Sequence, residues 1–320
     1  MLALRAENGQ LILDSAAPRP HRDDEALVRV TLAGICNTDL EILRGYVDFV
    51  GVLGHEFVGV VERSPSGDLD GQRVVGEINA HCVDCPTCRA GRPTHCPNRT
   101  TLGIWGRDGA HAEYVSLPER NLHIVPPAVP DEAAVFTEPL AAALEIPDRV
   151  QICPTDRVAV LGDGKLGLLV AHVLALTGCD LLLMGRHRRK LALAERSGIP
   201  THHPESPAGE LSPASFDIVV DCTGHPDGFA AARRLVRPRG TLVLKSTFHG
   251  DLAVNMSQIV VDEITLVGSR CGPFEPALRL LAAGLVDVEA LVDARFLLSQ
   301  GCEAYARAAE RGTLKVLLEA

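Results

Sequence analysis

The sequence predicts an α/β protein of two domains, in which a β-rich domain is combined with a doubly wound parallel sheet. Its 320 residues exceed the usual span of a single hydrophobic core. Between residues 11 and 115, short β-prone runs are separated by Gly, Pro and Asp, which is typical of a β-rich domain. From residue 157 onward, apolar runs alternate with helical stretches, as the βαβ units of a parallel sheet require.

The individual elements follow from these patterns in chain order. In the first half we expect strands at residues 26–32, 57–61 and 72–75. In the second half we expect strands at residues 157–161, 180–184, 216–221, 240–244 and 264–268, and helices that begin near Lys165, His187, Pro226 and Pro276. The second half then forms a sheet of about five or six strands. Pro147 and Pro154 indicate a linker at residues 146–155.

Composition and charge disfavour several classes of protein. The 31 Lys and Arg against 41 Asp and Glu give a formal charge of −10, which disfavours binding to nucleic acid or anionic lipid. The longest nearly unbroken apolar run, residues 166–176, contains His172 and is shorter than the roughly 20 residues that cross a bilayer, so we expect no membrane span. Arg5 and Glu7 interrupt the segment where a secretory signal would be apolar. We therefore expect a cytoplasmic protein whose cysteines are thiols or metal ligands.

Four cysteines form a closely spaced motif, C-x2-C-x2-C-x7-C, made of Cys82, Cys85, Cys88 and Cys96. Such spacing can place four sulfurs around one ion. Four thiolates at about 2.3 Å suit tetrahedral zinc, and a site without an open position is structural rather than catalytic. An iron–sulfur cluster is the alternative because Pro97 follows Cys96, but the last gap in such runs is shorter. The motif therefore predicts a zinc-stabilised loop at residues 82–96.

A second set of metal-ligating residue types lies on both sides of this motif. Cys36 and the triplet Gly54-His55-Glu56 precede it, and Glu138 follows it. Cysteine, histidine and carboxylate form a three-ligand set for catalytic zinc, which leaves a fourth position for water or a substrate oxygen. A lone histidine is more often a hydrogen-bonded core residue, so this prediction depends on the combination.

Thr38 and Asp39 follow Cys36 after one intervening residue. A hydroxyl at this place can pass a substrate proton outward, and a carboxylate can orient a metal-bound imidazole. Thr and Asp are also both common N-cap residues, so the same residues predict a capped helix start. The two interpretations are compatible.

A dinucleotide-binding loop is predicted between the first parallel strand and the helix after it. The strand runs into Gly162-x-Gly164-x-x-Gly167, and the helix begins at Lys165 and Leu166. The glycines permit a tight turn, close approach of a pyrophosphate and close packing of helix on strand. The helix N-terminus supplies N–H donors and positive potential to the phosphates.

The end of the second parallel strand predicts the choice of coenzyme. An NAD site usually has Asp or Glu at this place to bind the ribose 2′-hydroxyl, but here the strand ends in Gly185 and is followed by Arg186. Further basic residues, up to Lys190, open the next helix, where positive charge is unfavourable unless an anion lies beside it. We therefore predict NADP rather than NAD, with Arg186 binding the 2′-phosphate. The alternative is a solvated basic turn.

Taken together, these motifs resemble the zinc-dependent medium-chain dehydrogenase/reductase (alcohol dehydrogenase) superfamily over essentially the whole chain. The motifs that carry the resemblance are Cys36-x-Thr38-Asp39, Gly54-His-Glu56, the four-cysteine loop, Glu138-Pro-Leu140 and Gly162-x-Gly-x-x-Gly167. The Gly-His-Glu and Glu-Pro-Leu motifs are more similar to those of polyol, sugar and threonine dehydrogenases than to liver-type alcohol dehydrogenases.

The resemblance implies a GroES-like β-rich catalytic domain at residues 1–147, a Rossmann NAD(P)-binding domain at 148–271 and a return to the catalytic domain at 272–320. It also implies a small-molecule alcohol, polyol or carbonyl substrate. Relatives are mostly homodimers or homotetramers, so we expect the same here.

The resemblance assigns roles to individual residues. Cys36, His55 and Glu56 would bind catalytic zinc, and Glu138 would bind the zinc or its water. Because four protein ligands would leave a tetrahedral ion no place for substrate, Glu56 is favoured over Glu138 in the productive state. Thr38 would begin a proton relay.

Lys315 matches a position where relatives carry a basic residue near the coenzyme pyrophosphate. The alternative for Lys315 is a solvated surface lysine.

The expected activity is hydride transfer between an alcohol or polyol, or the matching ketone or aldehyde, and NADP(H). One alternative is a zinc-independent NADPH-dependent reductase of alkenes or quinones, which the presence of Cys36, His55 and Glu56 argues against. A second alternative is a non-catalytic NADP-binding sensor whose cysteines hold structural zinc. Binding of coenzyme without turnover would identify such a sensor.

Overall fold

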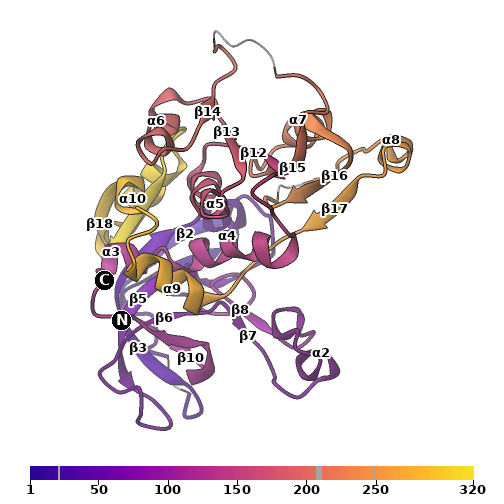
Figure 1. The fold of residues 1–320 in the computed structure, drawn as a ribbon. Coiled ribbons are helices and arrows are strands. Elements are labelled where there is room, and N and C mark those ends of the chain that lie inside the picture. Colours follow the sequence, from indigo (N-terminus) through magenta and orange to yellow (C-terminus); the bar gives the residue numbers. More distant parts are fainter. Residues whose placement is uncertain (21, 207–210, 248–249) are drawn as a thin grey trace. The chain divides into compact units, whose positions relative to one another are not determined.

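The computed structural model describes the chain except residues 21, 207–210 and 248–249, and none of the predicted site residues lies in these gaps. The chain divides into two compact units. The first comprises Met1–Glu138 and Phe274–Ala320, and the second comprises Pro139–Pro273. We call them the catalytic unit and the nucleotide unit and describe each separately (Figure 1).

The catalytic unit is built on a seven-stranded sheet. Along this sheet the strand order is β11-β6-β5-β3-β19-β18, and β10 also pairs with β3. The bounds are β3 Ala26–Ile35, β5 Glu56–Arg63, β6 Arg73–Gly76, β10 Tyr114–Leu117, β11 Leu122–Ile124, β18 Val292–Leu297 and β19 Lys315–Glu319. The central strand β3 is rich in Val, Leu and Ala, its last four residues are all buried, and it has sheet neighbours on both of its edges.

Among its described residues, this unit also contains two smaller sheets and five α-helices. The sheets have the orders β2-β1-β4 and β7-β8-β9. Their strands are β1 Ala3–Glu7, β2 Gln10–Asp14, β4 Gly51–Val52, β7 Asn79–Ala80, β8 Thr100–Leu102 and β9 Gly106–Arg107. The helices are α1 Asn37–Leu43, α2 Pro86–Arg89, α3 Asp131–Ala134, α9 Phe274–Ala282 and α10 Gly301–Ala309.

The nucleotide unit contains a six-stranded sheet that is parallel throughout, with the order β14-β13-β12-β15-β16-β17. Its strands are β12 Arg157–Leu161, β13 Asp180–Met184, β14 Thr201–His202, β15 Phe216–Asp221, β16 Val236–Leu244 and β17 Thr265–Gly268. Its helices are α5 Lys165–Ala175, α6 Arg188–Arg196, α7 Pro226–Leu235 and α8 Met256–Val261. The strand order changes direction at β12, and nucleotides bind outside the carboxyl ends of strands at such a switch point.

Most of the elements predicted from periodicity are present. The strands predicted at residues 157–161, 180–184 and 216–221 have those bounds, and α5 and α7 begin at the predicted residues. Strand β16 begins earlier than predicted, at Val236. Strand β14 was not predicted because two residues carry no detectable alternation.

The predicted linker at residues 146–155 is partly wrong, because helix α4 (Thr137–Arg149) continues into it. Pro147 lies in the last turn of α4, where its missing N–H removes one helical hydrogen bond near the end. The next turn still closes, since the N–H of Val150 donates to the carbonyl oxygen of Ile146 at 2.9 Å.

No helix among the described residues is both long enough and apolar enough to cross a membrane.

Candidate active site

The register of the central sheet brings together three of the predicted metal ligands. Gly34 of β3 pairs with Glu56 of β5, so Cys36, just after β3, lies beside His55 and Glu56 at the start of β5. Within the described residues, one potential ligand atom from each of these three side chains lies within 4.8 Å of the other two. His55 and Glu56 are buried, and Cys36 is half-buried.

Asp39 makes the predicted contact with His55, and it caps helix α1 from the third helical position, because Cys36 rather than Thr38 or Asp39 is the N-cap residue. Its Oδ2 atom accepts a hydrogen bond from the N–H of Cys36 at 2.8 Å, which caps helix α1. Its Oδ1 atom lies 3.3 Å from Nδ1 of His55, which leaves Nε2 of that ring available to a metal ion. Asp39 is fully buried, and burial raises its pKa, but the charge of His55 and the hydrogen bond from the Cys36 N–H outweigh burial and lower the pKa to about 2. The imidazole is therefore oriented by an ionised carboxylate.

The carboxylate of Glu56 forms an ion pair with Lys315, the first residue of β19. Lys315 is fully buried, its ammonium contacts Oε2 of Glu56, and it lies 5.4 Å from the centre of the Phe136 ring. The alternative of a solvated lysine is therefore wrong. β19 pairs with β3 so that Val316 lies opposite Ile35, which places Lys315 next to the ligand group rather than at the surface.

The donor set fits a divalent cation. Oε1 of Glu56 is buried and finds no hydrogen-bond partner among the residues that the structure describes. A buried carboxylate oxygen without a donor is costly, and a metal ion would satisfy it. A thiolate, an imidazole and a carboxylate are a ligand combination suited to zinc.

Two other residues predicted for this site lie outside the three-ligand group. Thr38 is half-buried, and its Oγ1 lies 3.7 Å from Sγ of Cys36. Glu138 is in the first turn of α4, and it is not a member of the ligand group found in the described chain. The structure therefore brings Glu56, rather than Glu138, to Cys36 and His55.

The four cysteines of the predicted loop converge on one point. The Sγ distances are 3.5 Å for Cys85–Cys88, 3.7 Å for Cys85–Cys96 and 3.5 Å for Cys82–Cys96. Four sulfurs at about 2.3 Å from a tetrahedral ion are separated by about 3.8 Å, so the loop has close to the dimensions of a zinc site. None of the ten cysteines forms a disulfide. The loop residues 82–96 thus surround a site suited to structural zinc.

The glycine loop of the nucleotide unit has the geometry expected for a pyrophosphate site. Gly162 has a φ angle of +114°, a conformation that favours glycine. A Cβ atom on Gly164 would meet no atom within 4 Å beyond its own residue and its chain neighbours, so the backbone at Gly164 is open to a ligand. A Cβ on Gly167 would lie 1.9 Å from the carbonyl oxygen of Gly162, so only glycine fits there. Lys165 and Leu166 form the start of α5, whose N-cap is Gly164. These are the three roles that a dinucleotide loop requires of its glycines.

A carboxylate lies beside the end of β13, where the sequence motif lacks one. A Cβ built on Gly185 would lie 2.5 Å from Oδ2 of Asp163, which belongs to the glycine loop. The Asp163 carboxylate accepts a hydrogen bond from the N–H of His187 at 2.6 Å and lies 3.0 Å from its Nδ1. Arg186, between these residues, is exposed.

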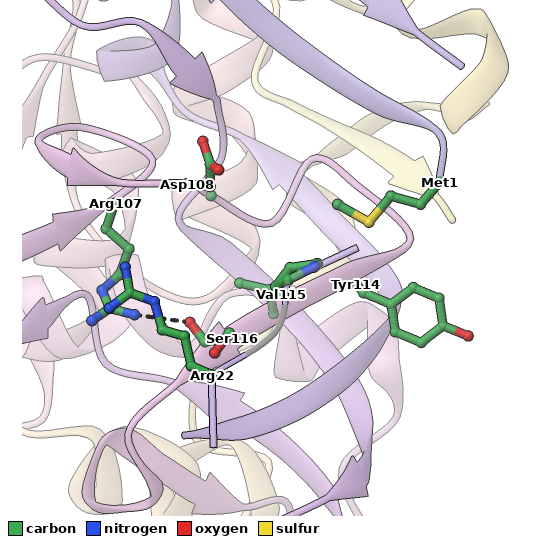
Figure 2. Close-up of a pocket in the computed structure, with 9 residues that line it drawn as sticks. Met1, Arg22, Arg107, Asp108, Tyr114, Val115 and Ser116 are labelled. Carbon is green, nitrogen blue, oxygen red and sulfur yellow. Dashed lines mark hydrogen bonds between the residues drawn. The ribbon is translucent and has the colours of Figure 1, made fainter. Parts of the chain in front are cut away.

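One pocket in the catalytic unit contains none of the predicted site residues. Its lining includes Arg22, Arg107 and Ser116, and Figure 2 shows the hydrogen bond from Arg107 to the Ser116 carbonyl oxygen. Arg107 also makes two hydrogen bonds of 2.7 Å to the carboxylate of the buried Glu25. The charge of Arg107 is therefore neutralised by Glu25, and we assign no ligand to this pocket.

Sequence reasoning missed four side chains that surround the predicted residues: Asp163, His187, His111 and Tyr305. Asp163 lies inside the glycine motif, where its position between two glycines could have drawn attention. His111 and Tyr305 meet only through the tertiary fold, because 194 residues separate them.

Comparison with known proteins agrees with this geometry. The alcohol dehydrogenase GroES-like domain model matches residues 22–127, and the zinc-binding dehydrogenase model matches residues 166–283. The erythritol/L-threitol dehydrogenase of Mycolicibacterium smegmatis is 30% identical over 90% of this chain and 88% of its own length.

Two solved structures extend the similarity over the whole chain. A zinc-binding dehydrogenase from Sinorhizobium meliloti 1021 bound to NADP has a TM-score of 0.90 and 30% identity, and the match covers 100% of this chain and 99% of that one. The RspB alcohol dehydrogenase of Escherichia coli CFT073, complexed with NADH, has a TM-score of 0.89 and 27% identity with the same coverage.

The chain therefore belongs to the zinc-dependent medium-chain alcohol dehydrogenase superfamily. It combines a GroES-like domain with a Rossmann-type parallel sheet, and it is an NAD(P)-dependent oxidoreductase of the alcohol dehydrogenase class. The predictions of fold class and family are confirmed.

Proposed function

We propose that the protein transfers a hydride between the carbinol carbon of an alcohol or polyol, or the matching ketone or aldehyde, and NADP(H), with zinc at the site of Cys36, His55 and Glu56. The observation that carries the proposal is the convergence of these three side chains together with the unsatisfied, buried Oε1 of Glu56. Relatives named erythritol/L-threitol dehydrogenase and sorbitol dehydrogenase support the substrate class.

The chain's own groups then have distinct tasks. When bound, zinc supplies a Lewis acid that lowers the cost of negative charge on the substrate oxygen. Cys36 and Glu56 supply negative charge to the ion, and Asp39 holds the ring of His55. The Thr38 hydroxyl, half-buried beside Cys36, relays the hydroxyl proton of an alcohol substrate, because it releases its own proton to solvent water as it accepts the one from the substrate.

The nucleotide unit binds the coenzyme in this proposal. The N–H groups at the start of α5 hold the pyrophosphate beside Gly164. The missing acid at the end of β13 and the exposed Arg186 support NADP. NAD is the second candidate, because the Asp163 carboxylate lies beside Gly185 and would repel a 2′-phosphate while accepting a hydrogen bond from a 2′-hydroxyl.

Two substitutions separate the two coenzymes. Arg186→Asp should shift preference from NADP towards NAD by at least about tenfold in Kd, measured by quenching or enhancement of bound reduced coenzyme fluorescence. If NAD is the true coenzyme, Arg186→Asp changes little and Asp163→Asn instead weakens NAD binding. Unchanged selectivity in the Arg186 variant would reject the NADP assignment.

The zinc mechanism is tested by metal content and turnover on one sample. The purified protein should contain two zinc ions per chain and reduce NADP with a member of a panel of polyols, sugars, hydroxy amino acids and simple alcohols. Cys36→Ala should lower the metal content to one ion and abolish turnover. Turnover that survives in Cys36→Ala would favour a zinc-independent reductase, and coenzyme binding without turnover of any substrate would favour a sensor.

Exposed apolar groups support a homodimer as the assembled state. Strand β17 is at the edge of its sheet and pairs only with β16 within the described residues. Leu266 on this strand is exposed, as are Met256, Val260 and Val261 on the nearby chain segment of α8. An unpaired edge beside exposed apolar side chains can pair with the same edge of a second copy.

A further inference from the structure

A buried histidine and tyrosine of the catalytic unit form a hydrogen bond that the proposed reaction does not use. Nδ1 of His111 lies 2.8 Å from the hydroxyl oxygen of Tyr305, and Nε2 lies 3.3 Å from the carbonyl oxygen of Gly34. The two rings meet edge-on at 84°, with centroids 5.7 Å apart. His111 is 0% exposed and Tyr305 is 4% exposed.

The partners decide the direction of both hydrogen bonds. A carbonyl oxygen only accepts, so Nε2 of His111 carries the hydrogen and donates to Gly34. A neutral imidazole then has a lone pair on Nδ1, and the Tyr305 hydroxyl donates to it. His111 and Tyr305 are both buried, and burial lowers the pKa of His111 and raises the pKa of Tyr305. Both groups are therefore neutral, and every ring heteroatom is satisfied.

His111 touches both chain segments that carry metal ligands. Gly34, which accepts its hydrogen bond, lies two residues before Cys36. Gly54, just before His55, has φ +94°, and a Cβ there would lie 2.3 Å from Cδ2 of His111, so the imidazole packs on the backbone of this turn.

Backbone hydrogen bonds fix the same turn to the segment of His111. The N–H of His111 donates to the Leu53 carbonyl oxygen at 2.8 Å, and the N–H of Ala110 donates to that of Gly54 at 2.9 Å. Through Tyr305, this arrangement is joined to helix α10. His111 thus connects α10, the end of β3 and the turn before β5.

We propose that His111 and Tyr305 are positioning residues that hold Cys36 and His55 at the separation required for metal binding, an inference that rests on the proposed zinc site. Two apolar rings would fill the same space, but they would form no hydrogen bonds, and apolar contacts do not fix the relative orientation of the two rings. The directional chain from Tyr305 through His111 to Gly34 fixes the imidazole against the segment of Cys36. The backbone hydrogen bonds to Leu53 and Gly54 fix the segment of His111 against the segment of His55.

The test separates positioning from simple packing by comparing Tyr305→Phe, His111→Phe and the double variant. Tyr305→Phe leaves Nδ1 of His111 buried without a donor, so this variant should unfold at lower denaturant concentration than the wild type. The double variant removes both polar partners, so its denaturation midpoint should return close to that of the wild type. Tyr114→Phe is the matched control, because the hydroxyl of Tyr114 makes no hydrogen bond within the described chain and the ring faces Arg19.

The decisive measurement is the rate of zinc release to a chromogenic chelator, which does not depend on catalysis. Two kinetic phases of zinc release are expected, one for each metal site, and the phase that is absent in Cys36→Ala belongs to the site of Cys36. This phase should be about tenfold faster in both single variants and should stay fast in the double variant, whereas release from the four-cysteine loop should not change. The visible spectrum of the cobalt-substituted protein should shift in the same variants.

The proposal is overturned if the double variant recovers wild-type zinc release along with its stability, because the pair would then serve packing alone. It is also overturned if Tyr305→Phe releases zinc at the wild-type rate. A wild type that binds no zinc at Cys36 would instead reject the proposed function, and the two failures are therefore distinguishable.

Discussion

Lys315 and Glu56 show how one buried ion pair can hold a metal ligand before the metal arrives. Lys315 is the only group that the described structure places against Oε2 of Glu56, while Oε1 has no partner there. The lysine therefore compensates the buried carboxylate and still leaves one oxygen for an ion. Burying either charged side chain without the other would cost several kcal/mol of free energy, because its charge would be unpaired.

Replacing Lys315 by Met should lower the free energy of unfolding of the metal-free protein by about 3–5 kcal/mol, since Glu56 would be buried without a counter-charge. The loss should be smaller with zinc bound, because the ion supplies positive charge. Denaturant titrations with and without zinc measure both values. Lys190→Met, in the nucleotide unit, is the control and should show the same loss in both conditions. A zinc-independent loss in the Lys315 variant would contradict the prediction.

The pair of Glu25 and Arg107 predicts how stability depends on pH. Burial raises the pKa of Glu25, but hydrogen bonds from Arg107 and Ser116 and the charge of Arg107 outweigh burial and lower this pKa below its usual value. The folded protein thus binds this proton more weakly than the unfolded chain. The stabilisation is present above the unfolded-state pKa and disappears as pH falls through the lower folded-state pKa.

Unfolding free energies of the wild type and Glu25→Gln, measured from neutral pH down to about pH 3, should therefore converge as pH falls. At neutral pH the variant should be less stable by about 3–5 kcal/mol, because Arg107 loses a buried, two-fold hydrogen-bonded partner. The exposed Glu7→Gln is the control and should differ little from the wild type at any pH. A difference that grows on acidification would refute the assignment.

Among the elements, the four-cysteine loop depends most on a metal. Helix α2 has only four residues, and the 3-10 turn Pro93–His95 has three. Such short pieces are not stable without a cross-link. The four sulfur positions could hold a metal ion, and a zinc ion there would provide the cross-link, as in other small metal-stabilised loops.

Cys96→Ser should remove one zinc ion per chain and expose the amides of residues 82–96 to rapid hydrogen exchange, because the buried sulfur is lost from the site. Metal analysis and hydrogen exchange measured by mass spectrometry check the two effects. The exposed Cys302→Ser should change neither quantity. Iron instead of zinc in the wild type would favour the cluster alternative, and unchanged exchange in the Cys96 variant would show that the loop does not need the metal.

For the assembled protein, the edge of the nucleotide-unit sheet predicts a dimer. Leu266→Lys adds a charge on the strand that forms the unpaired edge of the sheet, β17, so the variant should sediment as a monomer at concentrations where the wild type is a dimer. Leu285→Lys, at a similarly exposed apolar residue of the catalytic unit, should leave the sedimentation coefficient unchanged. A monomeric wild type, or a dimer that persists in the Leu266 variant, would exclude this edge as the interface.

The local patterns of the chain were enough to predict the parallel sheet, the glycine loop and the four-cysteine loop. Each of these depends on neighbours within one strand–turn–helix unit or within a short run, so spacing reports them directly. The grouping of Cys36, His55 and Glu56 was predicted from residue types and family resemblance, and the register of β3 with β5 shows how it arises.

Tertiary structure decided the rest, because it depends on which strands become neighbours. Pairing of β19 with β3 buries Lys315 against Glu56, although 259 residues separate them, and no local pattern distinguishes such a lysine from a surface one. The same holds for Tyr305 on His111 and for Asp163 beside Gly185. A side chain's charge state and partners follow from what the fold packs against it, and sequence spacing carries that information only for near neighbours.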